Sequence, residues 1–420
     1  MKTKFTKILL GSTLVLLGLC NKANSQSQWV QTNTPPGGSV WAMEAIGNNL
    51  FAGATNGGVY FSNDNGVNWV QRNGLFPSMQ VYSLAVNGTD IYAGTGGALG
   101  GGVYKSSDNG LNWTNVTPST MNSSTNVRSL AVNSTHIYAG TFGGGGIFMS
   151  LLNGISSSSW SSFNTNLTNQ DTRSLKIKGT TIYAGTYGNG VWVSPLNSPS
   201  WSLTSSTMPG NSDYIQALDV SGSAIFAGNI IGLPVLYRST DNGITWIQSN
   251  TSIFNDKPVY AINSNVNNVY VGTEGAGMFL STDNGVNWSQ YNQGFQDISG
   301  NWFCNQINVR SIVFTGTNIF AGTDCGVWKR SLLALGINEF RDNNLFVLYP
   351  NPNNGKFKIN ISSINKINIE IFNLLGEKIY ATSNFIQQSN EIDLSNSIKG
   401  IYFVKIYDGE KVQTEKIVIQ

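Results

Sequence analysis

VYSLAVNGTDIYAGTGGALGGGVYKSSDNGLNW, residues 81–113, contains the pattern that decides the fold. An alternating stretch, Val81–Val86, is followed by a turn, an aromatic-Ala-Gly strand, a Gly-rich loop and a third strand that ends at Ser106. A tight turn then leads into a strand that begins with Trp113. This stretch therefore predicts four short antiparallel strands joined by turns.

The aromatic-Ala-Gly strand recurs seven times, with Val in place of Ala in the sixth copy. Its aromatic residues, 41 to 50 positions apart, are Phe51, Tyr92, Tyr138, Tyr183, Phe226, Tyr270 and Phe320. This spacing is the period of a four-stranded propeller blade. The seventh copy lacks a fourth strand, whereas residues 28–31 (QWVQ) match residues 68–71 (NWVQ). We therefore predict an all-β chain in which a seven-bladed β-propeller, residues 26–334, is closed by its N-terminal strand.

Four of the turns before the tryptophan carry the octet S-x-D-x-G-x-x-W. Their acids are Asp64, Asp108, Asp241 and Asp283. An aspartate accepts backbone hydrogen bonds within its own turn, glycine permits positive φ, and tryptophan anchors the outer strand. The octet resembles the Asp-box of sialidase-like BNR-repeat propellers, and that resemblance implies a structural role for the four acids.

The two ends of the chain differ in composition from the repeats. Residues 1–25 combine basic residues, an apolar stretch from Ile8 to Leu19 and the small-residue tripeptide at 23–25, which predicts a secretory signal peptide. A lipoprotein site at Cys20 is an alternative. Removing the leader takes the formal charge from +2 to −2, because it contains Lys2, Lys4, Lys7 and Lys22.

A polar linker, residues 335–344, separates the repeats from a lysine-rich, tryptophan-free module at residues 345–420. We expect strands at 346–349, 356–361, 367–372, 401–407 and 414–419, forming a small antiparallel sandwich. The motifs LYPNP (348–352), IFN (371–373), GIYFVK (400–405) and KIVI (416–419) resemble the type A C-terminal sorting domain of the type IX secretion system. The resemblance implies export through the periplasm and outer membrane, with the translocon and its shuttle protein as partners, to the cell surface or medium.

Composition excludes several functions. The chain has one histidine, His136, so multi-histidine metal sites are absent, and we expect neither a metal nor another cofactor. The nearly neutral mature chain offers no basic face for nucleic acid.

Outside the leader the chain has two cysteines, Cys304 and Cys325, which an exported protein is expected to join as a disulfide. Two separate buried thiols are the alternative.

Candidate ligand residues lie where the repeats align at the start of the first strand, on the face where propellers usually bind ligands. They are Trp41, Tyr82, Arg128, Arg173, Gln216, Tyr260 and Arg310, with Tyr187, Ile230 and Trp302 in loops of the same face. Arginines and aromatics together could clamp an anion and stack a sugar or peptide. Alternatively, they wedge between neighbouring blades.

The repeats do not decide between binding and catalysis. The Arg-Ile-Pro motif of sialidases is absent, and Glu274 and Asp324 are the one carboxylate pair on this face that we would test for glycoside hydrolysis. Both could equally be solvated loop acids. Similar repeats in photosystem assembly factors, which use an arginine patch, leave a protein partner open. We expect a secreted or surface binding module for a glycan or protein, with a polysaccharide-degrading hydrolase as the alternative.

Overall fold

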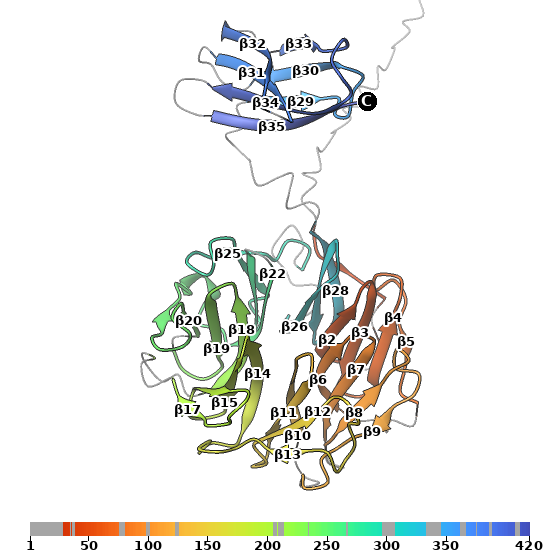
Figure 1. Ribbon diagram of the computed structural model, residues 1–420, viewed down its shortest axis with the longest axis vertical. Coiled ribbons are helices and arrows are strands. Elements are labelled where there is room, and N and C mark those ends of the chain that lie inside the picture. Colours follow the sequence, from red (N-terminus) through yellow and green to blue (C-terminus); the bar gives the residue numbers. More distant parts are fainter. Residues whose placement is uncertain are drawn as a thin grey trace, which may run out of the picture. The chain divides into compact units, whose positions relative to one another are not determined.

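The structure is a computed structural model that describes residues 28–33, 35, 38–74, 80–97, 101–121, 126–204, 208, 214–233, 235–265, 268–295, 307–332, 346–361, 367–374, 376–385, 389–407 and 412–420 (Figure 1). These fall into two compact units, one within residues 27–333 and one from residue 334 onward. The predicted signal peptide, the linker, Trp302 and Cys304 lie outside the described residues.

The first unit consists of seven four-stranded antiparallel sheets in the part of the chain that the structure describes. In six of them, consecutive strands pair in chain order. Their strands are β2 (Val40–Ile46), β3 (Asn49–Ala54), β4 (Gly58–Ser62) and β5 (Val70–Gln71); β6 (Gln80–Asn87), β7 (Asp90–Gly96), β8 (Val103–Ser106) and β9 (Thr114–Asn115); β10 (Asn126–Val132), β11 (His136–Phe142), β12 (Ile147–Leu151) and β13 (Ser161–Ser162); β14 (Thr172–Lys178), β15 (Thr181–Thr186), β16 (Val191–Pro195) and β17 (Ser202–Leu203); β18 (Ile215–Ser221), β19 (Ala224–Asn229), β20 (Leu236–Ser239) and β21 (Ile247–Gln248); and β22 (Val259–Asn265), β23 (Asn268–Thr273), β24 (Met278–Ser281) and β25 (Ser289–Gln290). A short 3-10 helix, η2 (Ser252–Phe254), precedes β22.

The seventh sheet combines the two ends of the unit. Strands β26 (Val309–Phe314), β27 (Asn318–Thr323) and β28 (Gly326–Ser331) are joined by β1 (Val30–Gln31), in which Val30 lies opposite Lys329. Trp29, just before β1, is buried, stacks on Phe295 with ring centroids 4.8 Å apart, and donates its indole N–H to the Tyr291 carbonyl at 2.6 Å. The N-terminal strand therefore completes the seventh sheet and binds the sixth.

Neighbouring sheets approach closely at the glycine of each aromatic-Ala-Gly motif. A β carbon on these glycines would lie 2.5 to 2.8 Å from a β-branched side chain of the next sheet's first strand. The pairs include Gly53 with Val81, Gly228 with Val259 and, between the seventh sheet and the first, Gly322 with Val40. Because real β carbons do not approach that closely, the sheets pack as they do only with glycine at this position.

The turns with the S-x-D-x-G-x-x-W octet connect the third strand of a sheet to its outer strand, and hydrogen bonds within each turn fix its conformation. In the first, the Ser62 hydroxyl donates to Asp64 at 2.7 Å, and Asp64 accepts the backbone N–H of Asn68 at 2.9 Å. The same bonds recur around Asp108, Asp241 and Asp283. The turn glycines have positive φ, as expected, but so do the preceding asparagines, for example Asn65 at 58°. Each turn thus uses two left-handed residues in succession.

The C-terminal unit is a sandwich of two antiparallel sheets. One contains β29 (Phe346–Tyr349), β30 (Lys356–Ile361) and β33 (Ser389–Asp393), and the other, in the order β32-β31-β34-β35, contains β31 (Ile367–Asn373), β32 (Lys378–Phe385), β34 (Gly400–Tyr407) and β35 (Val412–Ile419). All five expected strands are present. β32 and β33 were not among the predicted strands, because their segments lack a clear apolar alternation.

Replacing Trp29 by Ala tests how much the N-terminal strand stabilises the first unit. The substitution removes a buried indole, its stacking on Phe295 and its hydrogen bond, so we expect the free energy of unfolding to fall by about 3–5 kcal/mol. Urea unfolding followed by tryptophan fluorescence measures it, because residues 345–420 contain no tryptophan. Val30→Ala, at an exposed position of β1, is the control, and equal small losses for both variants would contradict the expectation.

Candidate functional site

Each of the seven first strands contains a β-bulge at the same position. The pairing with the second strand shifts register once, between Val40 and Ala42 in β2 and at the equivalent place in the other six. The residue at the shift is the candidate ligand residue in every sheet: Trp41, Tyr82, Arg128, Arg173, Gln216, Tyr260 and Arg310. A bulge redirects one side chain out of the alternation, so the backbone itself aims these seven residues.

The redirected side chains meet around one cavity. It has a volume of about 270 Å³ and is lined by all seven bulge residues and by Ile230. The residue before each bulge is β-branched and fully buried against the preceding sheet, as Val40 and Val127 are. Thus one residue of each first strand fixes the contact between sheets while the next one faces the cavity.

Arg128 lies in the middle of an aromatic cluster. Its guanidinium carbon is 3.7 Å from the centroid of the Tyr82 ring and 5.5 Å from that of Trp41. Its Nε and Nη1 are buried and make no hydrogen bond to the described residues. Burial lowers the pKa of Arg128 to about 10, and repulsion from Arg173 adds to the effect. The guanidinium therefore remains charged and lacks an anionic partner in the described part of the chain.

Arg173 occupies a similar position in the next sheet. Its guanidinium carbon lies 4.1 Å from the Phe142 ring centroid and 4.6 Å from that of Tyr187. Burial lowers its pKa, although the charge of Asp171 opposes this. Asp171 is occupied elsewhere, since its Oδ1 accepts the backbone N–H groups of Gly143 and Gly144 at 2.9 and 3.1 Å.

Arg310 differs from the other two because a carboxylate neutralises it. It donates through Nε and Nη2 to Asp324, the latter bond measuring 3.0 Å, and Asn308 donates to the same carboxylate at 2.6 Å. Burial alone would raise the pKa of Asp324, but these hydrogen bonds hold it below its usual value. Asp324 therefore stays ionised and positions Arg310 between the rings of Trp41 and Tyr260.

The remaining predicted residues lie around this core. Glu274 does not line the cavity but accepts a hydrogen bond from Tyr260, and burial together with this bond raises the Tyr260 pKa. Tyr187 contacts Arg173 without lining the cavity. None of the four octet aspartates is among the lining residues. Cys325 contributes its backbone carbonyl to the Gln31 side chain, and its predicted pairing with Cys304 remains a prediction.

A second charged group was not predicted from the sequence. It consists of Glu44, Lys176 and Asp219, each of which lies three positions after the bulge residue of its strand. Lys176 forms an ion pair with Asp219 at 3.0 Å. Ser264 donates to the other Asp219 oxygen at 2.6 Å. Burial raises the Glu44 pKa to about 7, and the charge of Lys176 opposes the rise. The three residues come from the first, fourth and fifth sheets along the chain, so local sequence patterns did not indicate that they meet.

Comparison with known families identifies the C-terminal unit. Residues 347–420 match the secretion system C-terminal sorting domain. The protein is therefore exported by type IX secretion to the cell surface or the medium, and its C-terminal unit interacts with that machinery. No helix within the described ranges is long and apolar enough to cross a membrane.

Solved structures with a similar fold support a β-propeller. They include YCF48 bound to a D1 peptide (14% identity, 73% of this chain, 96% of that chain, TM-score 0.55). A GH74 xyloglucanase from Xanthomonas campestris has 13% identity over 80% of this chain and 60% of its own, with a TM-score of 0.55. The extracellular domain of a hybrid two component system from B. thetaiotaomicron has 14% identity over 94% and 57%, with a TM-score of 0.57. At these identities the likeness extends to the fold alone, and no curated protein matches the sequence significantly.

The raised pKa of Glu44 predicts a pH-dependent stability. Because the folded state holds this proton more tightly than the unfolded state, the favourable contribution is complete below about pH 4.5 and is lost as the pH rises through about 7. Glu44→Gln removes the partly buried charge, so above pH 7 the variant should be more stable than the natural protein by about 2–3 kcal/mol. Below pH 4.5 the two should converge.

Urea unfolding at pH 4.5, 6 and 8 measures this difference. Glu274→Gln, which makes the same chemical change in a loop, is the control and should show no such trend. A constant difference between the Glu44 variant and the natural protein at all three pH values would contradict the assignment.

Proposed function

We propose that the seven sheets are the blades of one closed seven-bladed propeller, spanning residues 26–334. Two observations support closure: β1 completes the sheet of β26–β28, and Gly322 packs on Val40 as the glycines of the other sheets pack on their neighbours. Tryptophan side chains also link the second and the first sheet to a neighbouring one. The Trp113 indole N–H donates to the Arg72 carbonyl of the preceding sheet, and the Trp69 indole N–H donates to the Thr32 hydroxyl beside β1. The proposal includes the signal peptide at 1–25, Asp-box turns, a sorting domain at 345–420 and the Cys304–Cys325 disulfide.

The exported propeller acts in this proposal as a binding module whose ligand enters the cavity at the bulges. One observation carries it: Arg128 and Arg173 line the cavity and form no ion pair with the described residues, and Nε and Nη1 of Arg128 and Nε of Arg173 make no hydrogen bond to them. Partial burial of a cation that forms no ion pair is costly, so an anionic ligand gains more from this site than a neutral one. Stacking on Tyr82 and Phe142 keeps the two guanidinium planes in place before the ligand arrives.

The ligand class is an extracellular glycan or a surface protein that carries an anionic group. Proteins of similar fold include one described with a bound peptide and one described as a xyloglucanase. The aromatic rings nearest the cavity carry guanidinium groups on their faces, as Tyr82 and Trp41 do. Recognition in this proposal therefore relies on charge and hydrogen bonding, with less stacking than the sequence suggested.

A hydrolase is the weaker alternative. Glycoside hydrolysis needs two carboxyl groups free to act on the substrate, and the candidates were Glu274 and Asp324. Asp324 is held by Arg310 and Asn308, and Glu274 is bonded to Tyr260. Both carboxylates therefore serve to position cavity residues, which favours binding without turnover.

The first experiment is a binding screen of the purified mature protein against glycan arrays, polysaccharides and cell-surface proteins, with a product assay on every polymer that binds. Arg128→Gln and Arg173→Gln should each weaken binding about tenfold or more, since each removes a charge-assisted interaction worth roughly 1.5–3 kcal/mol. Arg310→Gln, whose charge Asp324 already neutralises, should weaken binding less.

Salt provides a second readout, because binding that depends on uncompensated charge weakens as ionic strength rises. Binding that is unaffected by both Arg128→Gln and Arg173→Gln would reject the cavity as the site. If a product is released from a bound polymer, and Glu274→Gln abolishes that release, the hydrolase becomes the preferred function and simple binding the alternative.

A further inference from the structure

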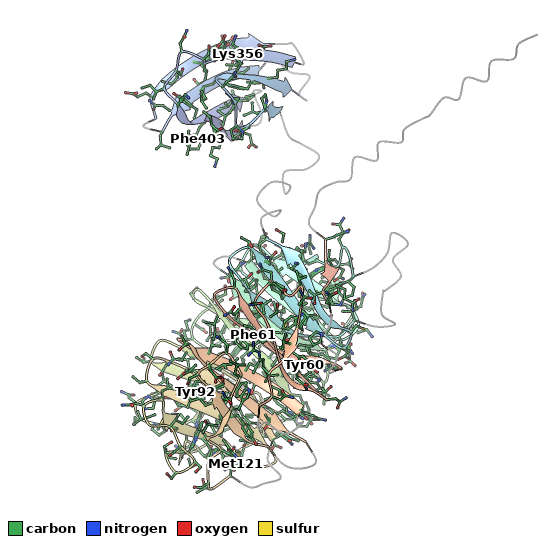
Figure 2. All side chains as sticks on the ribbon, turned by 90° about the vertical axis from the view of Figure 1, so that its right-hand side faces the viewer. Tyr60, Phe61, Tyr92, Met121, Lys356 and Phe403 are labelled. Carbon is green, nitrogen blue, oxygen red and sulfur yellow. The ribbon has the colours of Figure 1, made fainter. Side chains whose placement is uncertain are left out.

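The two outer faces of the C-terminal unit are very different. In β34, Tyr402, Val404 and Ile406 point inward and belong to the core between the two sheets. The residues that alternate with them, Ile401 and Phe403 among them, therefore lie on the outer face. Figure 2 shows Phe403 and Lys356, a residue of the other sheet, on opposite sides of the unit.

The outer face of the β32-β31-β34-β35 sheet is apolar at one end. Phe403 lies directly opposite Phe372 of β31, and Ile401 lies opposite Val418 of β35. Leu374, next to the end of β31, is 68% exposed, and Ile398, just before β34, is 85% exposed. We call the four strand residues and the two exposed turn residues at the same end of the sheet the outer patch: Phe372, Ile401, Phe403 and Val418, with Leu374 and Ile398.

The two most exposed residues of the outer patch, Leu374 and Ile398, lie in turns that are held by hydrogen bonds. Around Leu374, the Asn373 side chain accepts the Glu377 backbone N–H at 2.9 Å and donates to the Glu377 carboxylate at 2.7 Å. Before β34, the Tyr402 hydroxyl donates to the Ile398 carbonyl at 2.5 Å. Both apolar side chains are thus held in water by hydrogen-bonded backbone, at the end of the sheet where Asn373 pairs with Tyr402.

The outer face of the other sheet, which contains β30 and β33, is charged. In β30, Lys356 pairs with Asp393 of β33, their ion pair measuring 3.0 Å, and Lys358 lies opposite Glu391. That face is charged and suits water, whereas the residues of the outer patch lie outside the core between the two sheets. An apolar patch of this kind marks an interaction surface.

The charges around the outer patch indicate the partner. Lys416 lies opposite Phe403 and Lys399 follows Ile398, and neither forms an ion pair with the described residues. Lys378, directly opposite Phe372, is paired with Glu370 at 2.6 Å. The surface is therefore apolar in the centre with two uncompensated positive charges at its edge, which complements an apolar protein surface that carries carboxylates at its rim.

We propose that the outer patch is the surface by which the sorting domain docks on a protein of the export machinery. A sorting domain must be read by another protein, and the outward residues of its motifs at 371–373, 400–405 and 416–419 have no role in the core of the unit. The inward residues of the same motifs fold the unit, and the outward ones present the signal. This proposal is independent of what the propeller cavity binds.

The test is export of the full-length protein in a bacterium that has the type IX system. Leu374→Ser combined with Ile398→Ser removes the two most exposed apolar side chains and should lower the exported amount about tenfold, because apolar side chains that become buried at an interface carry much of its binding energy. The protein should accumulate in the periplasm. Lys399→Glu with Lys416→Glu should give a similar reduction by reversing the charge at the rim.

Tyr407→Ser is the matched control, since it removes an exposed apolar ring at the other end of β34 and should leave export unchanged. Circular dichroism of the purified variants should show unchanged melting of the C-terminal unit. Normal export of the Leu374/Ile398 variant would overturn the proposal, as would an equal defect in Tyr407→Ser. Sedimentation that shows a dimer disrupted only in the patch variants would overturn it in favour of a second copy of the chain as the occupant.

Discussion

The contact between a bare glycine and a β-branched side chain of the next sheet is the constraint on which the rest of the first unit depends. It recurs between successive sheets and again between the seventh sheet and the first, where Gly322 meets Val40. Since the distance leaves no room for a β carbon, the contact sets how closely the sheets pack. The aromatic-Ala-Gly motif is therefore a packing requirement.

The candidate site follows from that contact. Each buried β-branched residue is followed at once by a bulge, so that rigid packing on one side determines the direction of a cavity residue on the other. Seven repeats of one backbone geometry thus place seven different side chains around one space of about 270 Å³. Variation of those side chains changes the chemistry of the site without changing the packing that supports it, which is why the cavity is asymmetric: Arg128 and Arg173 form no ion pair with the described residues, whereas Asp324 neutralises Arg310.

Repetition explains how much of this the sequence could predict. Aligning the repeats was enough to identify the positions of Trp41, Arg128 and Arg310, because the same local pattern recurs at each. The bulge itself was not visible, since it changes direction without changing residue type. The partnership of Arg310 with Asp324, and the meeting of Glu44 with Lys176 and Asp219, depend on distances between strands that no local pattern contains. In the C-terminal unit, alternation predicted the core strands, but polar β32 and β33 gave too weak a signal.

The most direct test of this account compares one substitution at three glycines. Urea unfolding, followed by tryptophan fluorescence, is measured for Gly322→Ala, Gly53→Ala and Gly316→Ala. The account predicts that Gly322→Ala destabilises the protein about as much as Gly53→Ala, because both added methyl groups overlap a valine of the adjoining sheet, while Gly316→Ala, with open space around it, has little effect. Equal stability of Gly322→Ala and Gly316→Ala would contradict the account, since the seventh and first sheets would then not share the contact that joins the others.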